Sequence, residues 1–116
     1  MESVNVPFTL PDMFAGFVEA NGLAKATPSE LTLEFVLKDG VFNVLKSGVK
    51  EIRIPQSEIE YVRVKHGIFR DKMNIRVKSL HWLADVPGCD GCELTLQVAR
   101  RNRSQAGDML QVLGRA

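Results

Sequence analysis

VKEIRIPQSEIEYVRVKHGIFRDKMNIRVKS, residues 49–79, is the stretch of this sequence that decides its fold. Three short runs of alternating apolar and charged residues lie within it, and connections of only a few residues join them. Alternation with a period of two places apolar side chains on one face of a strand and charged side chains on the other. Because connections this short join antiparallel neighbours, the stretch predicts a curled antiparallel meander.

The alternation also assigns an inward face to each of the three strands. Pro55 ends the first strand, since proline has no N–H to donate to the ladder. The second strand is predicted from Ile59 to His66 and the third from Lys72 to Ser79. In these strands we expect the following side chains to face the core: Ile52, Ile54, Val62, Val64, Met73, Ile75 and Val77.

Similar patterns continue on both sides of the meander. Residues 31–39 alternate and end at an Asp-Gly turn, residues 41–45 form a returning strand, and residues 93–99 alternate again. Apolar residues then recur at the spacing of an amphipathic terminal helix, at Ala106, Met109, Leu110 and Leu113. Five or six antiparallel strands followed by one helix predict a mainly β (α+β) fold, a small, partly open barrel that the helix caps.

The first 29 residues are predicted to form a lead-in with a short helix. A capping-box pattern begins at Thr9, and the pair Asn21-Gly22 is a typical C-terminal stop, so we expect a helix at residues 11–20 and then a linker. Its apolar residues at helical spacing are Met13, Phe14, Phe17 and Val18. The chain therefore divides into residues 1–29, the lead-in, and residues 30–116, the barrel with its terminal helix.

Composition narrows the class of protein. The chain has 116 residues, of which 45% are hydrophobic and 25% charged, which is typical of one globular domain. The net charge of +1 argues against a chain-wide attraction to nucleic acid or to an anionic membrane. No apolar run approaches the roughly 20 residues that span a bilayer, and the N-terminus lacks the pattern of a signal peptide. We therefore expect a cytoplasmic protein without a transmembrane segment.

The step Ile52-x-Ile54-Pro55-x-x-x-Ile59-x-x-Val62, followed by a final alternating strand and a terminal helix, resembles the bacterial pleckstrin-homology-like (PH-like) and GRAM-like domains. In such domains one strand ends just before a short bend, and the next restarts with an Ile-x-x-Val pattern. The resemblance covers residues 30–115 and implies a binding or assembly scaffold, often oligomeric in bacteria, with no consistent ligand. We therefore interpret the chain as a non-enzymatic PH-like binding or assembly module without a cofactor.

A cluster of basic residues on the meander is the first candidate site. Its members, on and between the second and third strands, are Arg63, Lys65, His66, Arg70, Lys72, Arg76 and Lys78. Such a cluster suits phosphate, a lipid head group or a nucleic-acid backbone, and the resemblance implies the same, because eukaryotic relatives of the fold bind lipid phosphates near this kind of hairpin. The alternative, which we favour, is a solvated strand face whose cations prevent edge pairing, because nearby carboxylates neutralise part of the charge, namely Glu51, Glu58, Glu60 and Asp71.

The number of aromatic residues near the basic cluster indicates whether the cluster binds nucleic acid. Single-stranded nucleic acid needs rings on which its bases stack. Only Tyr61 alternates in phase with the basic residues, and Phe69 lies in the connection between the strands. Because two rings make a thin stacking platform, we do not expect nucleic-acid binding.

Cys89-x-x-Cys92 is the second candidate site. Two thiolates supply half of a tetrahedral zinc site, and His66 and His81 are the only imidazoles in the chain to complete it. These histidines precede the cysteines rather than follow them at the usual spacing. The alternatives are a local or intermolecular disulfide and, as we favour, two reduced cysteines that flank an Asp-Gly turn. No cysteine or serine lies in a recognisable nucleophile motif, so we expect no catalysis.

A surplus of large apolar residues is the third candidate. Those that exceed the needs of one capped barrel include Met13, Phe14, Phe17, Val18 and Trp82. Either the first helix packs them on its own sheet, or they form the interface of a homo-oligomer or the docking surface for a protein partner.

Overall fold

The structure, a computed structural model, describes residues 3–10, 18–39, 49–83 and 91–113. Within these ranges the strands are β1 (Val4–Thr9), β2 (Val18–Ala26), β3 (Glu30–Asp39), β4 (Lys50–Pro55), β5 (Ile59–Lys65), β6 (Arg70–Val77) and β7 (Glu93–Ala99). The same ranges contain short 3₁₀ turns and one α-helix, namely η2 (Gln56–Glu58), η3 (Leu80–Leu83), η4 (Arg100–Asn102) and α1 (Arg103–Val112). The predicted returning strand at residues 41–45 lies outside the described residues.

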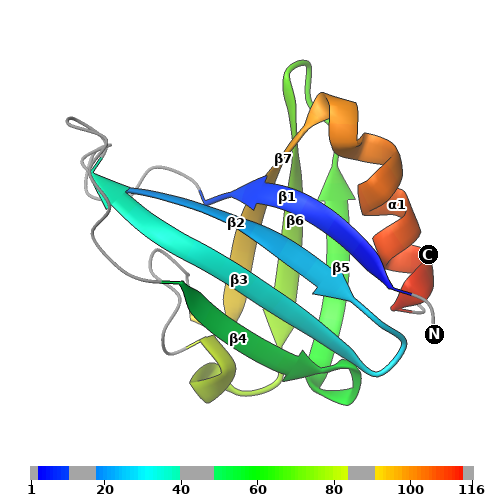
Figure 1. The fold of residues 1–116 in the computed structure, drawn as a ribbon. Coiled ribbons are helices and arrows are strands. Elements are labelled where there is room, and N and C mark those ends of the chain that lie inside the picture. The colour runs from blue at the N-terminus through cyan, green and yellow to red at the C-terminus, as the bar shows by residue number, and fades with distance from the viewer. Residues whose placement is uncertain (1–2, 11–17, 40–48, 84–90, 114–116) are drawn as a thin grey trace.

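All seven described strands belong to one antiparallel sheet in the order β4-β3-β2-β1-β7-β6-β5. The strands β1–β4 cross in front of β5–β7, and α1 lies along one side of the molecule (Figure 1). A single residue pair, Thr9 with Gln97, joins β1 to β7, so the sheet is partly open at this seam. The predicted architecture, a mainly β fold with a partly open antiparallel sheet and a C-terminal helix, is confirmed.

The core is built from the inward faces of the strands and from the terminal helix. Ile52, Ile54, Val62, Met73, Ile75 and Val77 are all buried, as the alternation predicts. Val64 is half-buried and packs against the same core. Helix α1 contacts β1 and β7, and buries Ala106, Met109 and, at its C-terminal end, Leu113. The helix therefore covers the sheet near its open seam.

An irregularity in β5 explains the Ile-x-x-Val spacing. Ile59 pairs with Val77, but Tyr61 pairs with Arg76, so Glu60 is an additional residue in the register. Strict alternation would place Ile59 and Val62 on opposite faces, yet both are buried. The bulge reverses the phase between them and turns Tyr61 and the residues in phase with it outward.

The predicted N-terminal helix is wrong where the structure describes it. Val18–Ala26 form strand β2, so the end of the expected helix and the first part of the expected linker belong to the sheet; residues 11–17 lie outside the described residues. Gly22 is the physical reason. It pairs with Phe8 on one side and Phe35 on the other, and a Cβ at Gly22 would lie 2.8 Å from the Phe8 ring. The glycine therefore makes room for the Phe8 ring and the Phe35 side chain inside a strand and ends no helix.

Candidate functional site

The β5–β6 hairpin carries the predicted basic cluster on its outer face, and its register sets the neighbours of each cation. Lys65 lies directly opposite Lys72, and Tyr61 lies opposite Arg76. We call the segment Lys65–Lys72 the hairpin tip. The hairpin base is the group Glu60, Tyr61, Arg76 and, from β7, Glu93.

At the hairpin base the cations are engaged by neighbouring groups. The Arg76 Nε lies 3.0 Å from Glu60 Oε2, and its Nη1 lies 3.9 Å from Glu93 Oε2. The Tyr61 hydroxyl donates to Glu93 Oε2 at 2.6 Å, and this bond raises the Tyr61 pKa above its ordinary value. Arg63 lies over the Tyr61 ring, with its guanidinium carbon 4.1 Å from the ring centroid. The base therefore offers little free positive charge.

The cations of the hairpin tip have no such partners. Lys65, Arg70 and Lys72 are exposed, and no carboxylate among the described residues forms an ion pair with them. Arg70 donates from Nη1 to Gln97 Oε1 at 2.7 Å, but this partner is neutral. Lys78 lies just past the other end of β6, so it does not join this group.

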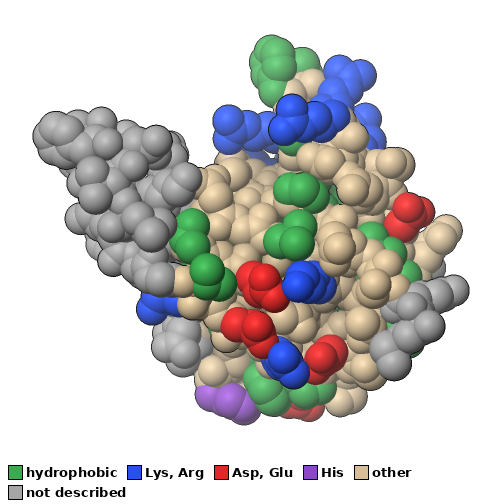
Figure 2. Space-filling model, in the orientation of Figure 1, with side chains coloured by type: hydrophobic (Ala, Val, Ile, Leu, Met, Phe, Trp, Pro, Cys, Tyr) green, Lys and Arg blue, Asp and Glu red, His purple; other side chains and the backbone are tan. Residues whose placement is uncertain are grey.

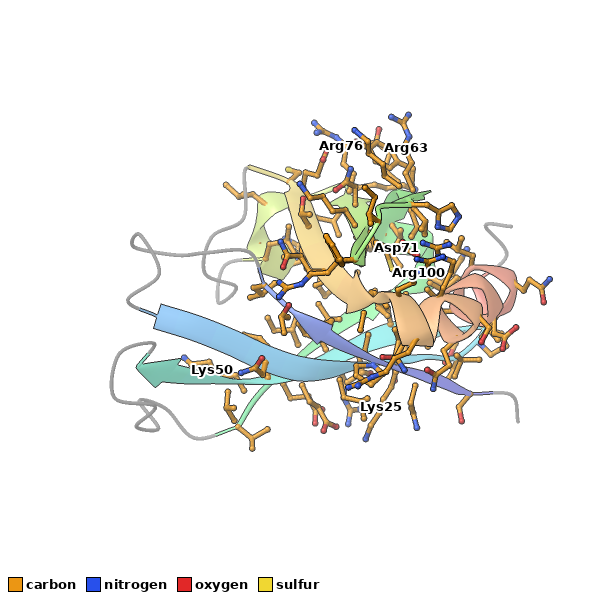
Figure 3. All side chains as sticks on the ribbon, turned by 90° about the horizontal axis from the view of Figure 1, so that it is seen from above. Lys25, Lys50, Arg63, Asp71, Arg76 and Arg100 are labelled. Atoms are coloured by element: carbon orange, nitrogen blue, oxygen red, sulfur yellow. The ribbon has the colours of Figure 1, made fainter. Side chains whose placement is uncertain are left out.

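Three further arginines, which were not among the predicted site residues, lie beside the tip. Strand β7 ends at Ala99, which pairs with Arg70, so the following run Arg100-Arg101-Asn102-Arg103 begins at the tip. Arg100 donates from Nη1 to the carbonyl oxygen of Ile68 at 3.3 Å. Figure 3 shows Arg100 and Asp71 close together, next to the start of α1. The basic run can be seen in the sequence, but its position beside the hairpin tip follows only from the pairing of β6 with β7.

The one acidic residue of the tip, Asp71, is buried and used internally. Arg103 binds it with two bonds, from Nε at 2.7 Å and from Nη2 at 2.8 Å. His66 Nδ1 lies 3.0 Å from Asp71 Oδ2, and the Gly67 N–H donates to Oδ1 at 3.2 Å. These bonds, above all those from Arg103, hold the pKa of Asp71 well below its ordinary value. The carboxylate anchors the tip to α1 and does not neutralise the exposed cations.

The tip end of the molecule is therefore strongly positive, although the whole chain is nearly neutral. Residues 65–72 and 100–103 contain six Lys and Arg residues and a single acidic residue. In Figure 2, Lys and Arg side chains gather at this end, whereas acidic and basic side chains alternate lower on the same face. On the strands β2, β3 and β4, opposite charges are paired instead, with Lys25–Glu34 at 3.0 Å and Arg53–Glu51 at 2.7 Å.

Two hollows lie among these cations. One, of about 120 Å³, is lined by Lys65, His66, Gly67, Arg70 and Lys72. The other, of about 340 Å³, lies at the open seam between β1 and β7, where Phe8, Gly22, Arg70 and Arg101 are among its lining residues. Arg70 borders both hollows. The larger one falls at the lower end of the volume range of small-ligand sites.

The structure describes only some of the residues of the predicted apolar interface. Met13, Phe14 and Phe17 lie outside the described residues, and Val18 belongs to β2. Trp82 is half-buried against the core, and its Nε1 donates to Glu58 Oε1 at 3.1 Å. Among the described residues, large exposed hydrophobic side chains occur instead at Val49, Ile68, Phe69 and Leu80.

The candidate metal ligands are not brought together in the described part of the chain. Cys89 lies outside it, and Cys92 is a half-buried free cysteine just before β7. His66 contacts Asp71 at the hairpin tip, whereas His81 follows the opposite end of β6 and lies 2.7 Å from the Ser79 hydroxyl. Within the described ranges no three His, Cys, Asp or Glu residues form a group able to hold a metal ion.

Comparison with known proteins found no matching family model, no matching curated protein and no matching solved structure. In the residues that the structure describes, no helix combines the length and the apolar character that a membrane crossing requires. The site is therefore interpreted from its own geometry and charge.

Proposed function

We propose that the chain is a non-enzymatic PH-like binding module that binds phosphate-bearing anions at its hairpin tip. The PH-like part is supported by the element order, in which the meanders β1–β4 and β5–β7 precede a terminal helix. The anion-binding part is supported by the tip and the neighbouring arginines. For assembly into a homo-oligomer, the candidates Met13, Phe14 and Phe17 lie outside the described residues, so the proposal concerns binding.

The single observation that carries the proposal is the like-charge pair Lys65–Lys72. Like charges directly opposite each other on neighbouring strands destabilise a sheet. The hairpin base uses the same outer face differently, because Arg76 is paired there with Glu60 and Glu93. A bound anion between Lys65 and Lys72 would remove their repulsion and take the place of the missing carboxylate.

The chemistry of the tip suits phosphate. Lysine ammonium groups act as compact point charges, whereas the planar guanidinium of Arg70 presents parallel N–H donors to two oxygens of one phosphate. The hollow of about 120 Å³ between Lys65, Arg70 and Lys72 is where such an anion would contact all three cations. His66 is held at the edge of this hollow by its contact with Asp71.

The proposal is tested by calorimetric titration with inorganic tripolyphosphate at low and at high salt. The wild type is expected to bind, and binding is expected to weaken steeply as salt screens the exposed charges. The double variant K65Q/K72Q should weaken binding by at least about tenfold, because each charge-assisted hydrogen bond contributes about 1.5 kcal/mol or more.

The matched control is Lys50→Gln. Lys50 is exposed on β4, and Figure 3 shows it at the far end of the molecule from Arg100 and Asp71. This variant removes one lysine charge far from the hairpin tip and should leave the affinity for tripolyphosphate unchanged. Equal affinities of the wild type and the double variant, or no binding by the wild type at low salt, would overturn the proposal.

A further inference from the structure

Two large apolar residues stand at the apex of the hairpin tip. Ile68 is 76% exposed and Phe69 is 83% exposed, more than any other large hydrophobic residue that the structure describes. Val49 and Leu80, the other described residues of this kind, lie on other segments. The β5–β6 hairpin projects beyond its neighbouring strands (Figure 1), and hydrophobic side chains lie at the extreme end of the molecule (Figure 2). Such an exposed apolar pair marks an interaction site.

Arginine side chains from η4 and from the start of α1 hold the loop that carries this pair. The Gly67 carbonyl accepts from Arg103 Nη2 at 3.1 Å, and the Ile68 carbonyl accepts from Arg100 Nη1 at 3.3 Å. Gly67 also allows a tight turn, because a Cβ there would lie 2.3 Å from the Arg70 carbonyl oxygen. The Gly67 N–H and the carbonyl oxygens of Gly67 and Ile68 thus have partners within the protein, while the Ile68 and Phe69 side chains remain exposed to solvent. These bonds restrain the backbone that carries Ile68 and Phe69, which lowers the cost of ordering the loop when it binds.

Exposed cations surround the apolar pair. Lys65, Arg70 and Lys72 come from the hairpin, and Arg100 and Arg101 come from η4. None of these five forms an ion pair with a carboxylate among the described residues. The end of the molecule is therefore an apolar apex with a basic collar beneath it, and Figure 2 shows this arrangement in profile.

We propose that the hairpin tip docks onto the surface of an anionic lipid bilayer, with Ile68 and Phe69 inserted among the lipid head groups. The collar cations then lie at the level of the lipid phosphates. This inference deepens the proposed function, on which it rests, because it identifies the phosphate-bearing anion as a lipid head group.

A bilayer fits this end of the molecule better than a protein surface does. The apex is narrow and convex, so a protein partner would need a matching cavity, whereas a fluid interface deforms around it. Apolar insertion and electrostatic attraction are the two signals that together hold a peripheral protein at a membrane, because either signal alone is weak. Aromatic side chains such as that of Phe69 are favoured at the boundary between head groups and acyl chains.

The first test is flotation of the full chain with vesicles of phosphatidylcholine mixed with phosphatidylserine, and with vesicles of phosphatidylcholine alone. We expect binding to the mixed vesicles only. The double variant I68S/F69S should reduce the partition coefficient by at least about tenfold, since two large side chains lose their apolar burial. Val49→Ser is the matched control, because Val49 is 72% exposed on another segment, and its partitioning should equal that of the wild type.

Tripolyphosphate titration of the same variants separates this inference from the proposed function. I68S/F69S should keep its affinity for tripolyphosphate, because no collar cation is changed. If the wild type binds tripolyphosphate but not the mixed vesicles, or if I68S/F69S partitions as well as the wild type, the membrane inference fails and the anion site stands. If the wild type binds neither, the proposed function fails as well.

A spectroscopic test reports insertion directly. In the wild type the sole tryptophan, Trp82, is half-buried after β6, away from the tip. The variant F69W is expected to show a blue-shifted emission with mixed vesicles and quenching by lipids brominated on the acyl chains, whereas the wild type shows neither. Unchanged emission of F69W on vesicles that bind it would contradict insertion. A single-stranded oligonucleotide that shifts this emission where vesicles do not would identify the apex as a stacking surface instead.

Discussion

The two ends of the β5–β6 hairpin have similar residues on the same outer face and opposite electrostatic surroundings. Lys72 and Arg76 lie four residues apart on β6, yet Lys72 faces Lys65 across the hairpin, whereas Arg76 lies between Glu60 and Glu93. The presence of a cation on this face therefore does not by itself indicate where an anion binds. What distinguishes the tip is that its carboxylate, Asp71, is buried under the loop and its exposed cations are left without acidic partners among the described residues.

This difference has an energetic meaning. A protein gains stability by placing opposite charges across neighbouring strands, as at the hairpin base, and loses stability by placing like charges there. Functional sites are where a fold departs from its own most stable arrangement. The Lys65–Lys72 pair is such a departure, and the anchor beneath it, Asp71 with Arg103, keeps the tip ordered despite the repulsion.

The largest effect is expected from Asp71→Asn, which breaks that anchor. The amide cannot accept both of the bonds from Arg103 that the carboxylate accepts, so the free energy of unfolding should fall by about 2 kcal/mol. Urea denaturation measures the change. The matched control is Asp108→Asn on the exposed face of α1, which should change stability by less than about 0.5 kcal/mol. Equal effects of the two substitutions would show that the anchor is unimportant.

The pH dependence of stability sharpens the same prediction. The native pKa of Asp71 lies well below the value of about 3.9 that an unfolded aspartate has, so below that pH the unfolded chain binds a proton that the native protein does not. Stability that is present above pH 4 is therefore lost as the pH falls further. Urea midpoints between pH 5 and pH 2 should fall less steeply for Asp71→Asn than for the wild type. Parallel profiles would contradict the assigned role of Asp71.

A smaller loss is expected from Arg76→Glu at the hairpin base. The substitution places a third carboxylate between Glu60 and Glu93, so attraction becomes repulsion and the urea midpoint should decrease. The affinity for tripolyphosphate should stay the same, because the base lies at the other end of the hairpin. A large loss of affinity with this variant would show that the base belongs to the binding surface.

The smallest effect, with the opposite sign, is expected from Lys72→Glu at the tip. Lys65 then faces a carboxylate, so the free energy of unfolding should increase by about 0.5 kcal/mol while tripolyphosphate binding is lost. A gain in stability together with a loss of binding is the signature of a site that trades stability for function. If Lys72→Glu instead destabilised the protein, the two lysines would not repel each other as the register implies.

The strands were predictable where one period dominated the sequence, as in residues 70–77. The helix expected at residues 11–20 was wrong in its last part, because the apolar spacing there does not reveal that Gly22 must fit between Phe8 and Phe35 on neighbouring strands. That requirement is a tertiary one, set by strands that are distant in the sequence. The Ile59-x-x-Val62 spacing was visible, but only the pairing with β6 identifies it as a bulge.

The candidate site was also predictable only as far as local alternation reaches. The basic residues of the hairpin could be named from their alternation, but whether each one is neutralised depends on β7, whose Glu93 and Gln97 lie opposite Arg76 and Lys72. The run 100–103 comes to the tip only because β7 ends beside Arg70. Local periodicity therefore predicts which face a side chain occupies, whereas its partners require the sheet order.

An amide NMR titration of the whole chain with inorganic tripolyphosphate at low salt shows directly whether the anion binds at the hairpin tip and not at the hairpin base. The unpaired tip should respond and the paired base should not. We predict chemical-shift changes confined to residues 65–72 and 100–103, with the amides of Glu60, Tyr61, Arg76 and Glu93 unmoved. Changes centred on the hairpin base, or none at all while the anion is in excess, would show that the hairpin tip is not the anion site.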